Sequence, residues 1–392
     1  MAKKRKSSSV KLVPVRFSKA KTPVIKIKVI GIGGAGGHIV SRMMSGERIK
    51  GVEFIAINTD TQDLNYTEAH RKIYIGKALT KGLGAGMNPE IGKQAADENR
   101  SEIGEALEGA DVVFVTAGMG GGTGSPGSTV VAEIAREKGI LTIAIVTRPF
   151  SFEGAQRLNI AQEWIGRLKD KVDALVVVPN DRIFSLINKD TPLLRAFGFV
   201  DDVLKNAVKA LAELINVPGI INVDFADIKT ILKDAGTTLI GIGIASGAER
   251  SVKSVNMALN SPLLELSIDG AKGVLFSVAG GRDLKMSEIS DIAKAIASNL
   301  DPSARVIFGA YHDRNLKDKS IKVTVIATGF NGMFSQRLAM PTLFTREETK
   351  KKEALPEEAR VFEEEKPEKS KQAQAKKSDQ WEIPAFLRKK RR

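Results

Sequence analysis

Residues 118–126 read Gly-Met-Gly-Gly-Gly-Thr-Gly-Ser-Pro, and this stretch decides which fold the surrounding sequence takes. It follows an apolar, β-branched run at 111–116, which predicts a buried strand, and it precedes a helical pattern at 128–138. Its glycines and two hydroxyl side chains form a flexible run of N–H and O–H donors suited to phosphate oxygens. Pro126 suits the first turn of a helix. The stretch therefore predicts a phosphate-binding loop between a strand and a helix.

A second glycine-rich loop lies earlier, at 31–38, and reads Gly-Ile-Gly-Gly-Ala-Gly-Gly-His. It follows a predicted strand at 24–30 and precedes a predicted helix at 38–44. It also fits G-x-G-x-x-G, with Glu53 where a dinucleotide-binding protein places its ribose-binding acid. A tight strand–helix turn explains one such loop, but two loops on one sheet indicate a phosphate site. A third glycine-rich stretch, 82–86, is a candidate for the same cleft, and no G-K-[ST] motif of a P-loop occurs.

Strand-like and helix-like stretches alternate outward from these loops, which predicts parallel βαβ units with both faces of the sheet covered. A longer amphipathic helix at 200–215 is predicted as a connector to a second α/β block over 221–330. The further predicted strands are 52–57, 140–146, 172–178, 273–278, 304–310 and 321–327, and the further predicted helices are 153–170 and 286–300.

Composition excludes several kinds of site. The 392 residues include no cysteine and three histidines, so disulfides, zinc–thiolate sites and thiol nucleophiles are excluded. No apolar run approaches the roughly 18 residues of a membrane span. The net charge of +14 first suggests a nucleic-acid binder, but residues 1–22 carry +8 and residues 381–392 carry +4. The body, 23–330, carries only +1, so a basic binding face on a globular domain is not expected.

Several motifs together resemble the FtsZ branch of the tubulin/FtsZ family. They stand in the family's order and spacing, and the last separates FtsZ from tubulin. They are Gly-Gly-Gly-Thr-Gly-Ser at 120–125, Thr-Arg-Pro-Phe-Ser-Phe-Glu-Gly at 147–154, Pro-Asn-Asp at 179–181, Asn-Val-Asp-Phe-Ala-Asp at 222–227, Ser-Pro-Leu-Leu-Glu at 261–265 and Glu-Ile-Pro-Ala-Phe-Leu-Arg at 382–388.

The resemblance implies an α/β fold in which a Rossmann-like parallel-sheet GTPase domain is joined by a central helix to a smaller α+β domain, with disordered tails. The implied parts are a basic arm at 1–22, a GTP-binding domain at 23–199, the central helix at 200–217, an activating domain at 218–330, a charged linker at 331–378 and a partner-binding peptide at 379–392.

The resemblance also implies which residues bind GTP or GDP. The phosphate contacts are Gly34, Ala35, Gly36, Gly37 and His38 in the first loop, and Gly120, Gly121, Gly122, Thr123, Gly124, Ser125 and Pro126 in the second. Glu153 and Arg157 match ribose and phosphate contacts, Asn180 and Asp201 match guanine contacts, and Phe197 matches the ring that stacks on the base. A carboxylate at Asp201 would accept from both the N1–H and the amino group of guanine. A helix cap at Asp201 and an i,i+4 surface pair at Glu153 and Arg157 are the structural alternatives.

Asp224 and Asp227 lie three residues apart at the start of a predicted helix, where the helix dipole by itself favours acids. The resemblance implies that they enter the nucleotide site of the next subunit and polarise the attacking water. Mg²⁺ would then bridge the phosphates and keep its remaining waters, without a dedicated protein cluster. A site split over two chains implies head-to-tail contacts and an open filament.

Partners and location follow from the same resemblance. It implies a filament at the mid-cell division ring in the cytoplasm, with residues 381–387 binding membrane-tether and regulatory division proteins. Ile383, Phe386 and Leu387 would form the apolar face of that docking helix. The basic arm is a candidate contact for anionic lipid or DNA.

The sequence departs from the family pattern at three positions, and two other classes of protein remain open. Pro126 replaces a glycine and removes one backbone donor, Ala35 replaces a glycine, and His38 stands where asparagine is common. One alternative is an NAD-dependent oxidoreductase, which rests on the first loop and Glu53. The other is a nucleic-acid-binding scaffold, which rests on the basic ends.

Overall fold

The computed structural model describes residues 25–45, 51–185, 187–188, 190–217, 219–261, 267–298, 300–313, 316–317 and 319–330. The predicted basic arm at 1–22, the linker at 331–378 and the terminal peptide at 379–392 lie outside the described residues, as do residues 262–265 of one family-like motif.

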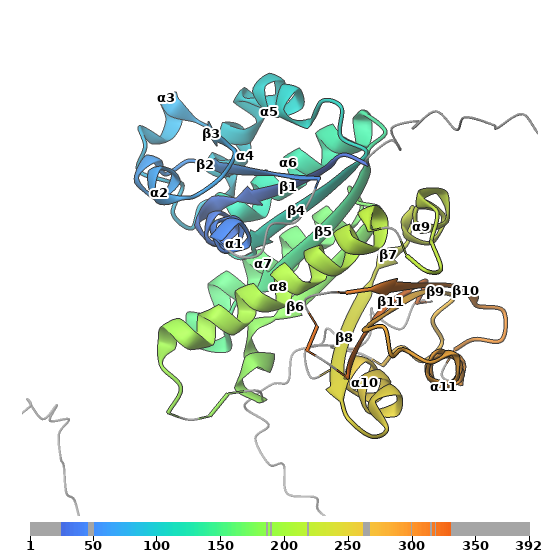
Figure 1. The fold of residues 1–392 in the computed structure, drawn as a ribbon. Coiled ribbons are helices and arrows are strands. Elements are labelled where there is room, and N and C mark those ends of the chain that lie inside the picture. Colours follow the sequence, from blue (N-terminus) through green and yellow to red (C-terminus); the bar gives the residue numbers. More distant parts are fainter. Residues whose placement is uncertain are drawn as a thin grey trace, which may run out of the picture. The chain divides into compact units, whose positions relative to one another are not determined.

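A seven-stranded sheet forms the first half of the described chain (Figure 1). Its strand order is β3-β2-β1-β4-β5-β6-β7, and every neighbouring pair is parallel, as the alternation of strands and helices predicts. The strands are β1 (Ile27–Ile32), β2 (Val52–Asn58), β3 (Arg71–Tyr74), β4 (Val112–Gly118), β5 (Leu141–Arg148), β6 (Ala174–Pro179) and β7 (Gly236–Thr237).

Strands β1 and β4 are neighbours, with Ile32 opposite Ala117 at their carboxyl ends. The chain leaves β1 toward β2 on one side and leaves β4 toward β5 on the other. This reversal of direction opens a crevice beyond the strand ends, which is where open parallel sheets bind ligands. The order of the strands thus brings the two predicted phosphate loops to the same crevice.

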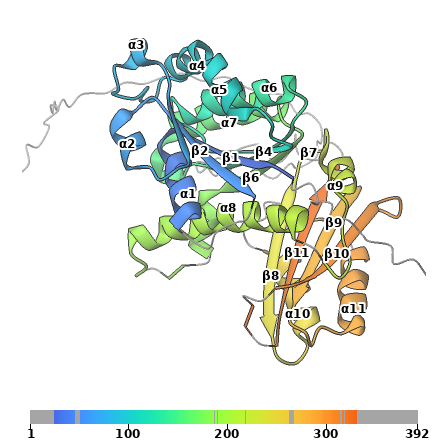
Figure 2. The same ribbon diagram turned by 45° about the horizontal axis from the view of Figure 1, so that its top comes forward.

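Helices cover both faces of this sheet (Figures 1 and 2). Alternate residues of each strand point to opposite faces, so Val29 and Phe114 join one apolar core, whereas Ile30 and Val115 join another. The first core includes side chains from α1 (Gly33–Ser45) and α8 (Leu193–Asn216). The second core is covered by α4 (Pro89–Glu98), α5 (Arg100–Leu107), α6 (Gly124–Glu137) and α7 (Ala155–Lys169). The short elements α2 (Thr61–Tyr66), α3 (Lys77–Thr80), η1 (Ser151–Glu153) and η2 (Asn180–Ser185) belong to the connections.

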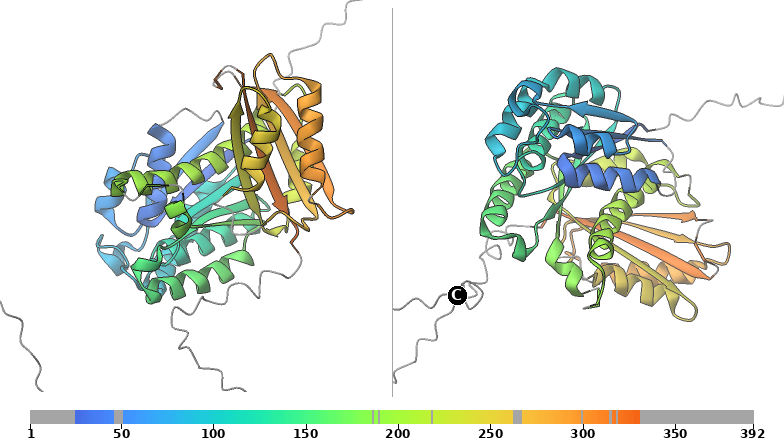
Figure 3. Two further views of the ribbon diagram at one scale, coloured as in Figure 1. Left: turned by 90° about the horizontal axis from the view of Figure 1, so that it is seen from below. Right: turned by 90° about the vertical axis from the view of Figure 1, so that its left-hand side faces the viewer.

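A mixed four-stranded sheet forms the second half, with the order β10-β9-β11-β8. Strand β10 is parallel to β9, whereas β11 is antiparallel to both β9 and β8, so the α+β expectation is confirmed. Helices α10 and α11 pack on one face, and α9 shares the core that contains α8 (Figure 3). The elements are β8 (Leu239–Ser246), β9 (Gly273–Gly280), β10 (Arg305–His312), β11 (Ser320–Thr328), α9 (Phe225–Leu232), α10 (Arg250–Leu259) and α11 (Met286–Ala297).

Helix α8 and strand β7 differ from the sequence prediction. Helix α8 begins at Leu193 rather than residue 200, directly after Pro192, its N-cap residue; Ala196 and Val200, four residues apart, are both buried. A Cβ on Gly198 would lie 2.8 Å from Nη1 of Arg42, so glycine lets the Arg42 side chain lie against this turn. Strand β7 pairs with β6 in the first sheet, although the sequence prediction places residues 236–237 in the second block.

Buried polar contacts join the last turns of α8 to the second sheet. A carboxylate oxygen of Glu213 lies 2.8 Å from Nζ of Lys322 and accepts a hydrogen bond from the Tyr311 hydroxyl at 3.0 Å. Lys322 also lies 3.3 Å from Asp313. Downstream, Ile221 pairs with Ala310 of β10 through backbone hydrogen bonds, which ties the segment before α9 to the same sheet.

Candidate functional site

A cavity of about 430 Å³ lies at the carboxyl ends of β1, β4 and β5 and is bounded by the first turns of α8. This volume falls in the range of small-molecule sites. Its lining combines glycine backbone with a few polar side chains. The lining residues are Ile32, Gly33, Gly34, Ala35, Ile39, Gly86, Gly118, Met119, Gly121, Gly122, Thr123, Gly124, Thr147, Pro149, Glu153, Arg157, Asn180, Phe197, Val200 and Asp201.

The first glycine loop is the opening of helix α1, which begins at Gly33 rather than at the predicted residue 38. Gly34 and Ala35 line the cavity, and the helix N-terminus supplies free N–H groups there. Gly36 lies behind them, where a Cβ would come within 2.7 Å of the Thr116 carbonyl oxygen. Gly37 is also buried, whereas the His38 side chain is 74% exposed; neither lines the cavity.

The second glycine loop contributes Gly121, Gly122, Thr123 and Gly124 to the lining, and α6 begins at Gly124. Gly120, Ser125 and Pro126 are buried beneath these residues and support the loop. The Ser125 hydroxyl accepts a hydrogen bond from the Gly120 N–H at 2.8 Å. Gly120 has a φ of 99°, a conformation that favours glycine.

Neighbouring loops hold the second glycine loop in place. The Gly122 N–H donates to the Gly86 carbonyl at 2.8 Å, and Gly86 lines the cavity, so the predicted third stretch reaches the same cleft. The Thr123 hydroxyl lies 2.7 Å from that of Thr59, which follows β2. A Cβ placed on Gly121 would have no contact within 4 Å, so the backbone of this residue faces open space.

Glu153 and Arg157 both line the cavity, and they also form, at 2.7 Å, the i,i+4 ion pair that was the structural alternative to a role in binding. The other Glu153 oxygen accepts from the Phe150 N–H at 2.8 Å. The Glu153 carboxylate is therefore oriented by two donors. The Arg157 side chain remains 43% exposed.

Asn180, Phe197 and Asp201 also line the cavity. Among the described residues, Oδ1 of Asn180 is buried without a hydrogen-bond partner, so the cavity contains an acceptor that a ligand donor would satisfy. Phe197 packs edge-on against Phe150, with ring centres 5.6 Å apart. Asp201 pairs with Arg42 at 3.0 Å; burial raises the pKa of Asp201, and the Arg42 contact opposes that rise.

Several lining residues are not among the contact residues named from the sequence. Ile32, Gly33, Met119, Thr147 and Pro149 lie within the quoted motifs, whereas Ile39 and Val200 lie outside them. They are neighbours of predicted residues at strand ends and helix starts. A residue at a strand end or a helix start is a candidate for the lining because of its position. In a sequence, however, the apolar members of this group look the same as core residues.

Asp224 and Asp227 do not line the cavity. Asp224 is the N-cap residue of α9, both side chains are exposed, and Asp224 forms no side-chain cap hydrogen bond. The cavity contacts the first turns of α8, whereas α9 follows the last turn (Figure 1). The rise from Asp201 to Asn216 along the helix is about 22 Å. One chain therefore does not bring these acids to its own cavity.

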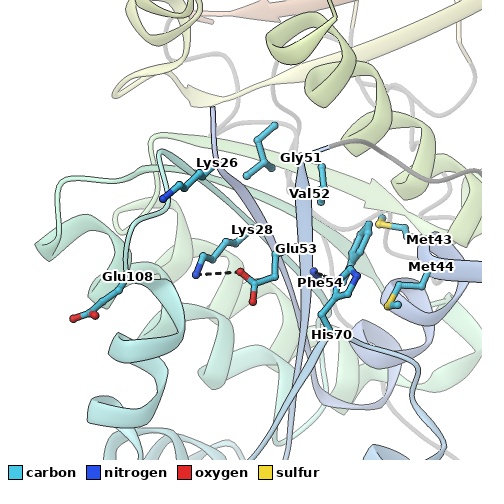
Figure 4. A pocket seen from close by; sticks show the side chains of 11 residues that line it. Lys26, Lys28, Met43, Met44, Gly51, Val52, Glu53, Phe54, His70 and Glu108 are labelled. Carbon is cyan, nitrogen blue, oxygen red and sulfur yellow. Dashed lines mark hydrogen bonds and ion pairs between the residues drawn. The ribbon is translucent and has the colours of Figure 1, made fainter. Parts of the chain in front are cut away.

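A second cavity, of about 780 Å³, lies at the opposite edge of the seven-stranded sheet, by the first residues of β1 and β2 (Figure 4). Glu53 lines it and pairs with Lys28 at 3.2 Å. A ribose-binding acid would have to lie by the glycine loops, at the carboxyl ends of the strands. The assignment of Glu53 to a dinucleotide site is therefore wrong, because Glu53 is the second residue of β2.

Two family models and several solved structures match this chain. Residues 26–188 match the model of the tubulin/FtsZ family GTPase domain, and residues 236–331 match that of the FtsZ family C-terminal domain. A solved structure of an empty FtsZ dimer from M. jannaschii is 47% identical, with a TM-score of 0.73, and the alignment covers 79% of this chain and 89% of that one. This chain belongs to the FtsZ family.

Other solved structures agree on the FtsZ fold. A variant of M. jannaschii FtsZ is 48% identical over 78% of this chain and 91% of its own, also with a TM-score of 0.73. A GDP-bound CetZ1 monomer from Haloferax volcanii shares the fold at 23% identity, with a TM-score of 0.69, over 79% of this chain and 95% of its own.

Membership of the FtsZ family makes this chain a GTPase-family protein, for which GTP binding, GTP hydrolysis and self-association are the general properties.

Within the described ranges, no three His, Cys, Asp or Glu side chains are grouped to hold a metal ion. No helix in the described part of the chain has the length and apolar character needed to cross a membrane.

Proposed function

We propose that this chain binds GTP in the cavity between the glycine loops and α8, and hydrolyses it when the next copy in a head-to-tail filament supplies Asp224 and Asp227. One observation carries the proposal: the cavity lies at the first turns of α8, and the acids follow its last turn. Family membership supports the GTPase chemistry, and the separation of the two parts supports a site shared by two copies.

The phosphates would bind the backbone N–H groups of Gly34, Ala35 and residues 121–124, at the first turns of α1 and α6. Glu153 would accept from the ribose hydroxyls, and Arg157 would contact phosphate. Guanine would lie by Asn180 and Asp201, with Phe197 against its face. The unpaired Oδ1 of Asn180 supports this orientation, because guanine carries N–H donors that would satisfy it.

Mg²⁺ would accompany the phosphates, where it neutralises charge that develops during phosphoryl transfer. The side chains beside the glycine loops fit such an ion, because Thr59, Thr123 and Asp63 offer oxygen atoms, the ligand class of Mg²⁺. Because the described residues contain no three-ligand cluster, phosphate oxygens and waters would supply most of its ligands.

The exposed carboxylates of Asp224 and Asp227 would orient and polarise the attacking water at the neighbour's γ-phosphate. Phosphoryl transfer depends mainly on positioning and charge stabilisation, so two acids delivered by a second chain suffice. A contact between the cavity end of one copy and the acid end of the next is heterologous, and its repetition gives an open filament.

In the cell, this filament would form the cytoplasmic mid-cell division ring. Residues 381–387 would dock membrane-tether and regulatory division proteins through an apolar helix face, and the basic arm at 1–22 would contact anionic lipid or DNA. These roles rest on family membership and on the residues quoted from the sequence.

The decisive experiment is the GTP hydrolysis rate measured against protein concentration. A site completed by a neighbour predicts almost no turnover below a threshold concentration and a steep rise above it. A rate per subunit that stays constant at all concentrations would contradict the shared site.

A mixing experiment then separates the two halves of the site. Asp227→Asn retains the cavity but lacks an acid, and Asp201→Asn retains the acids but weakens the cavity. At a GTP concentration that loads the wild-type cavity but not that of Asp201→Asn, each variant alone should be nearly inactive. The mixture should recover part of the wild-type rate, because some joints combine both intact halves. Mixtures no more active than the separate variants would count against the split site.

A further inference from the structure

Asp63 lies beside the first glycine loop, although no sequence motif pointed to it. It is the third residue of α2, whose N-cap residue Asp60 accepts from the N–H groups of Gln62 at 2.9 Å and Asp63 at 3.2 Å. The capped turn therefore determines where the Asp63 side chain begins.

Asn58 holds the Asp63 carboxylate in one orientation. Its amide nitrogen donates to Oδ2 of Asp63 at 2.7 Å. Asn58 is 4% exposed, and its own Oδ1 accepts from the N–H groups of Thr59 at 2.8 Å and Asp60 at 3.3 Å. A buried amide that is itself held by two backbone N–H groups thus positions a carboxylate whose side chain is 25% exposed.

The positioned carboxylate lies against Gly34, which lines the cavity. A Cβ placed on Gly34 would be 3.2 Å from Oδ2 of Asp63, so the carboxylate oxygen lies near van der Waals distance of this turn. Gly34 is one of the residues proposed to bind phosphate through its backbone. A negative charge is therefore held next to the place where the negative phosphates would bind.

A carboxylate and a phosphate that lie close together repel each other, and a partly buried site screens this repulsion less than bulk water does. Among the described residues, the ion-pair partner of Asp63 is His38, whose Nε2 lies 3.6 Å from Oδ1. The His38 side chain is 74% exposed, so it is a weak, solvated partner. A further cation beside the carboxylate would relieve this repulsion when phosphates occupy the cavity.

We propose that Asp63 is the charged oxygen donor, directly or through a water, for the divalent cation that accompanies the nucleotide, and that it makes nucleotide binding depend on that cation. This inference rests on the proposed GTP site. A purely structural role would need only a hydrogen-bond acceptor for Asn58, which the side-chain oxygen of asparagine also supplies. Asp63→Asn therefore removes the charge and retains the hydrogen bond.

The test measures the affinity for GDP and for a non-hydrolysable GTP analogue by calorimetry, below the assembly threshold, in EDTA and in excess Mg²⁺. The wild-type protein should bind much more tightly with Mg²⁺. Asp63→Asn should bind on the order of tenfold more tightly than wild type in EDTA, and should gain little from Mg²⁺. Glu68→Gln is the matched control, because Glu68 contacts Ser45 rather than the cavity, and it should behave as wild type.

A second readout addresses the ion itself. Mn²⁺ binding to the nucleotide-loaded protein, followed by electron paramagnetic resonance, should weaken about tenfold in Asp63→Asn and be unchanged in Glu68→Gln. An equal dependence on Mg²⁺ in wild type and Asp63→Asn would overturn the proposal. Unchanged Mn²⁺ affinity would also overturn it, even with tighter binding in EDTA, because His38 would then be the neutralising group. Failure of the wild-type protein to bind either nucleotide with Mg²⁺ would instead refute the GTP site.

Discussion

The two ends of helix α8 are held by different kinds of interaction. At its start, Val200 and Asp201 line the cavity, and Asp201 pairs with an Arg42 side chain that is 46% exposed. At its end, Glu213 and Lys322 form an ion pair in which both side chains are less than 15% exposed. Burial and the charge of Glu213 raise the pKa of Tyr311 well above its ordinary value, so this hydroxyl stays protonated and donates to Glu213.

The start of α8 is therefore suited to binding a ligand, and its end is suited to holding the second sheet. The start of α8 keeps its polar groups within reach of a ligand, whereas its end uses them to join the second sheet and the segment leading to Asp224. The helix has 24 residues and spans about 36 Å. Substitutions at the start should therefore change nucleotide binding, those beyond the end should change hydrolysis, and those at the end should change stability.

The largest effect is expected beyond the end of α8. Asp227→Asn should lower the hydrolysis rate by about 10²–10⁴-fold, because it removes a carboxylate proposed to act on the attacking water. Phosphate release measures this loss of hydrolysis. GTP binding and assembly should persist, and light scattering measures the assembly. Asp269→Asn, another exposed acid of the second half, is the control and should keep its rate. Wild-type turnover by Asp227→Asn would break the division of labour along α8.

The next effect is expected at the start of α8. Asp201→Asn should weaken GTP binding about 10–100-fold, because the amide oxygen can accept only one of guanine's two hydrogen bonds and carries no charge. It should strengthen binding of xanthosine triphosphate, whose base carries a carbonyl where guanine carries an amino group. Asp202→Asn is the matched control, since Asp202 is exposed on the same turn. An unchanged preference for guanine, measured by calorimetry, would place base recognition elsewhere.

A moderate effect on stability is expected at the end of α8. Glu213→Ala should lower the free energy of unfolding by about 2–4 kcal/mol, because it leaves the buried Tyr311 hydroxyl without its acceptor and leaves Lys322 with only Asp313 of its two carboxylate partners in the described residues. Glu249→Ala removes an exposed ion pair with Lys253 and should cost less than about 1 kcal/mol. Equal losses in the two variants, measured by urea unfolding, would show that burial does not distinguish the contact at Glu213.

The smallest effect concerns pH and the stability of the nucleotide-free protein. The folded-state pKa of Asp201 is raised above 3.8, chiefly by burial, so folding favours its protonated form. Its contribution to stability is complete below pH 3.8 and is lost as the pH rises through the raised pKa. Asp201→Asn should therefore match wild type at low pH and become relatively more stable above that range, as measured by unfolding at several pH values. Asp202→Asn should show a smaller change, and a constant difference for Asp201→Asn would contradict the role of burial.

Much of the fold follows from local patterns. The apolar runs before residues 31 and 118 predicted strands β1 and β4, and the glycines that follow them predicted loops at strand ends. The start of α8 was missed, because residues 193–199 lack a clear helical period and contain Gly198. The two-residue strand β7 was missed for a different reason: two residues carry no periodicity, and only pairing with β6 makes them a strand.

The parts of the candidate site that consist of a short motif can be predicted from the sequence. The parts that depend on contacts between residues distant in the chain cannot. Glycine spacing marked both phosphate loops, and family resemblance marked Asn180, Phe197 and Asp201, which all line one cavity. Glu53 was assigned to the wrong edge of the sheet, because sequence distance does not say at which end of a strand a residue lies. Asp63 carried no signal, since its importance comes from a glycine that lies 29 positions earlier in the chain and next to it in space.

The alternation of strands and helices, the two glycine-rich loops and membership of the family can all be predicted from the sequence, because each depends on residues that are neighbours in the chain. The tertiary structure decided that both loops share one cavity, that Asp224 and Asp227 lie a helix length away from it, and that Asp63 lies against Gly34. Those relations depend on strand order and helix packing, which join residues far apart in the chain and are determined by the burial of the whole apolar core.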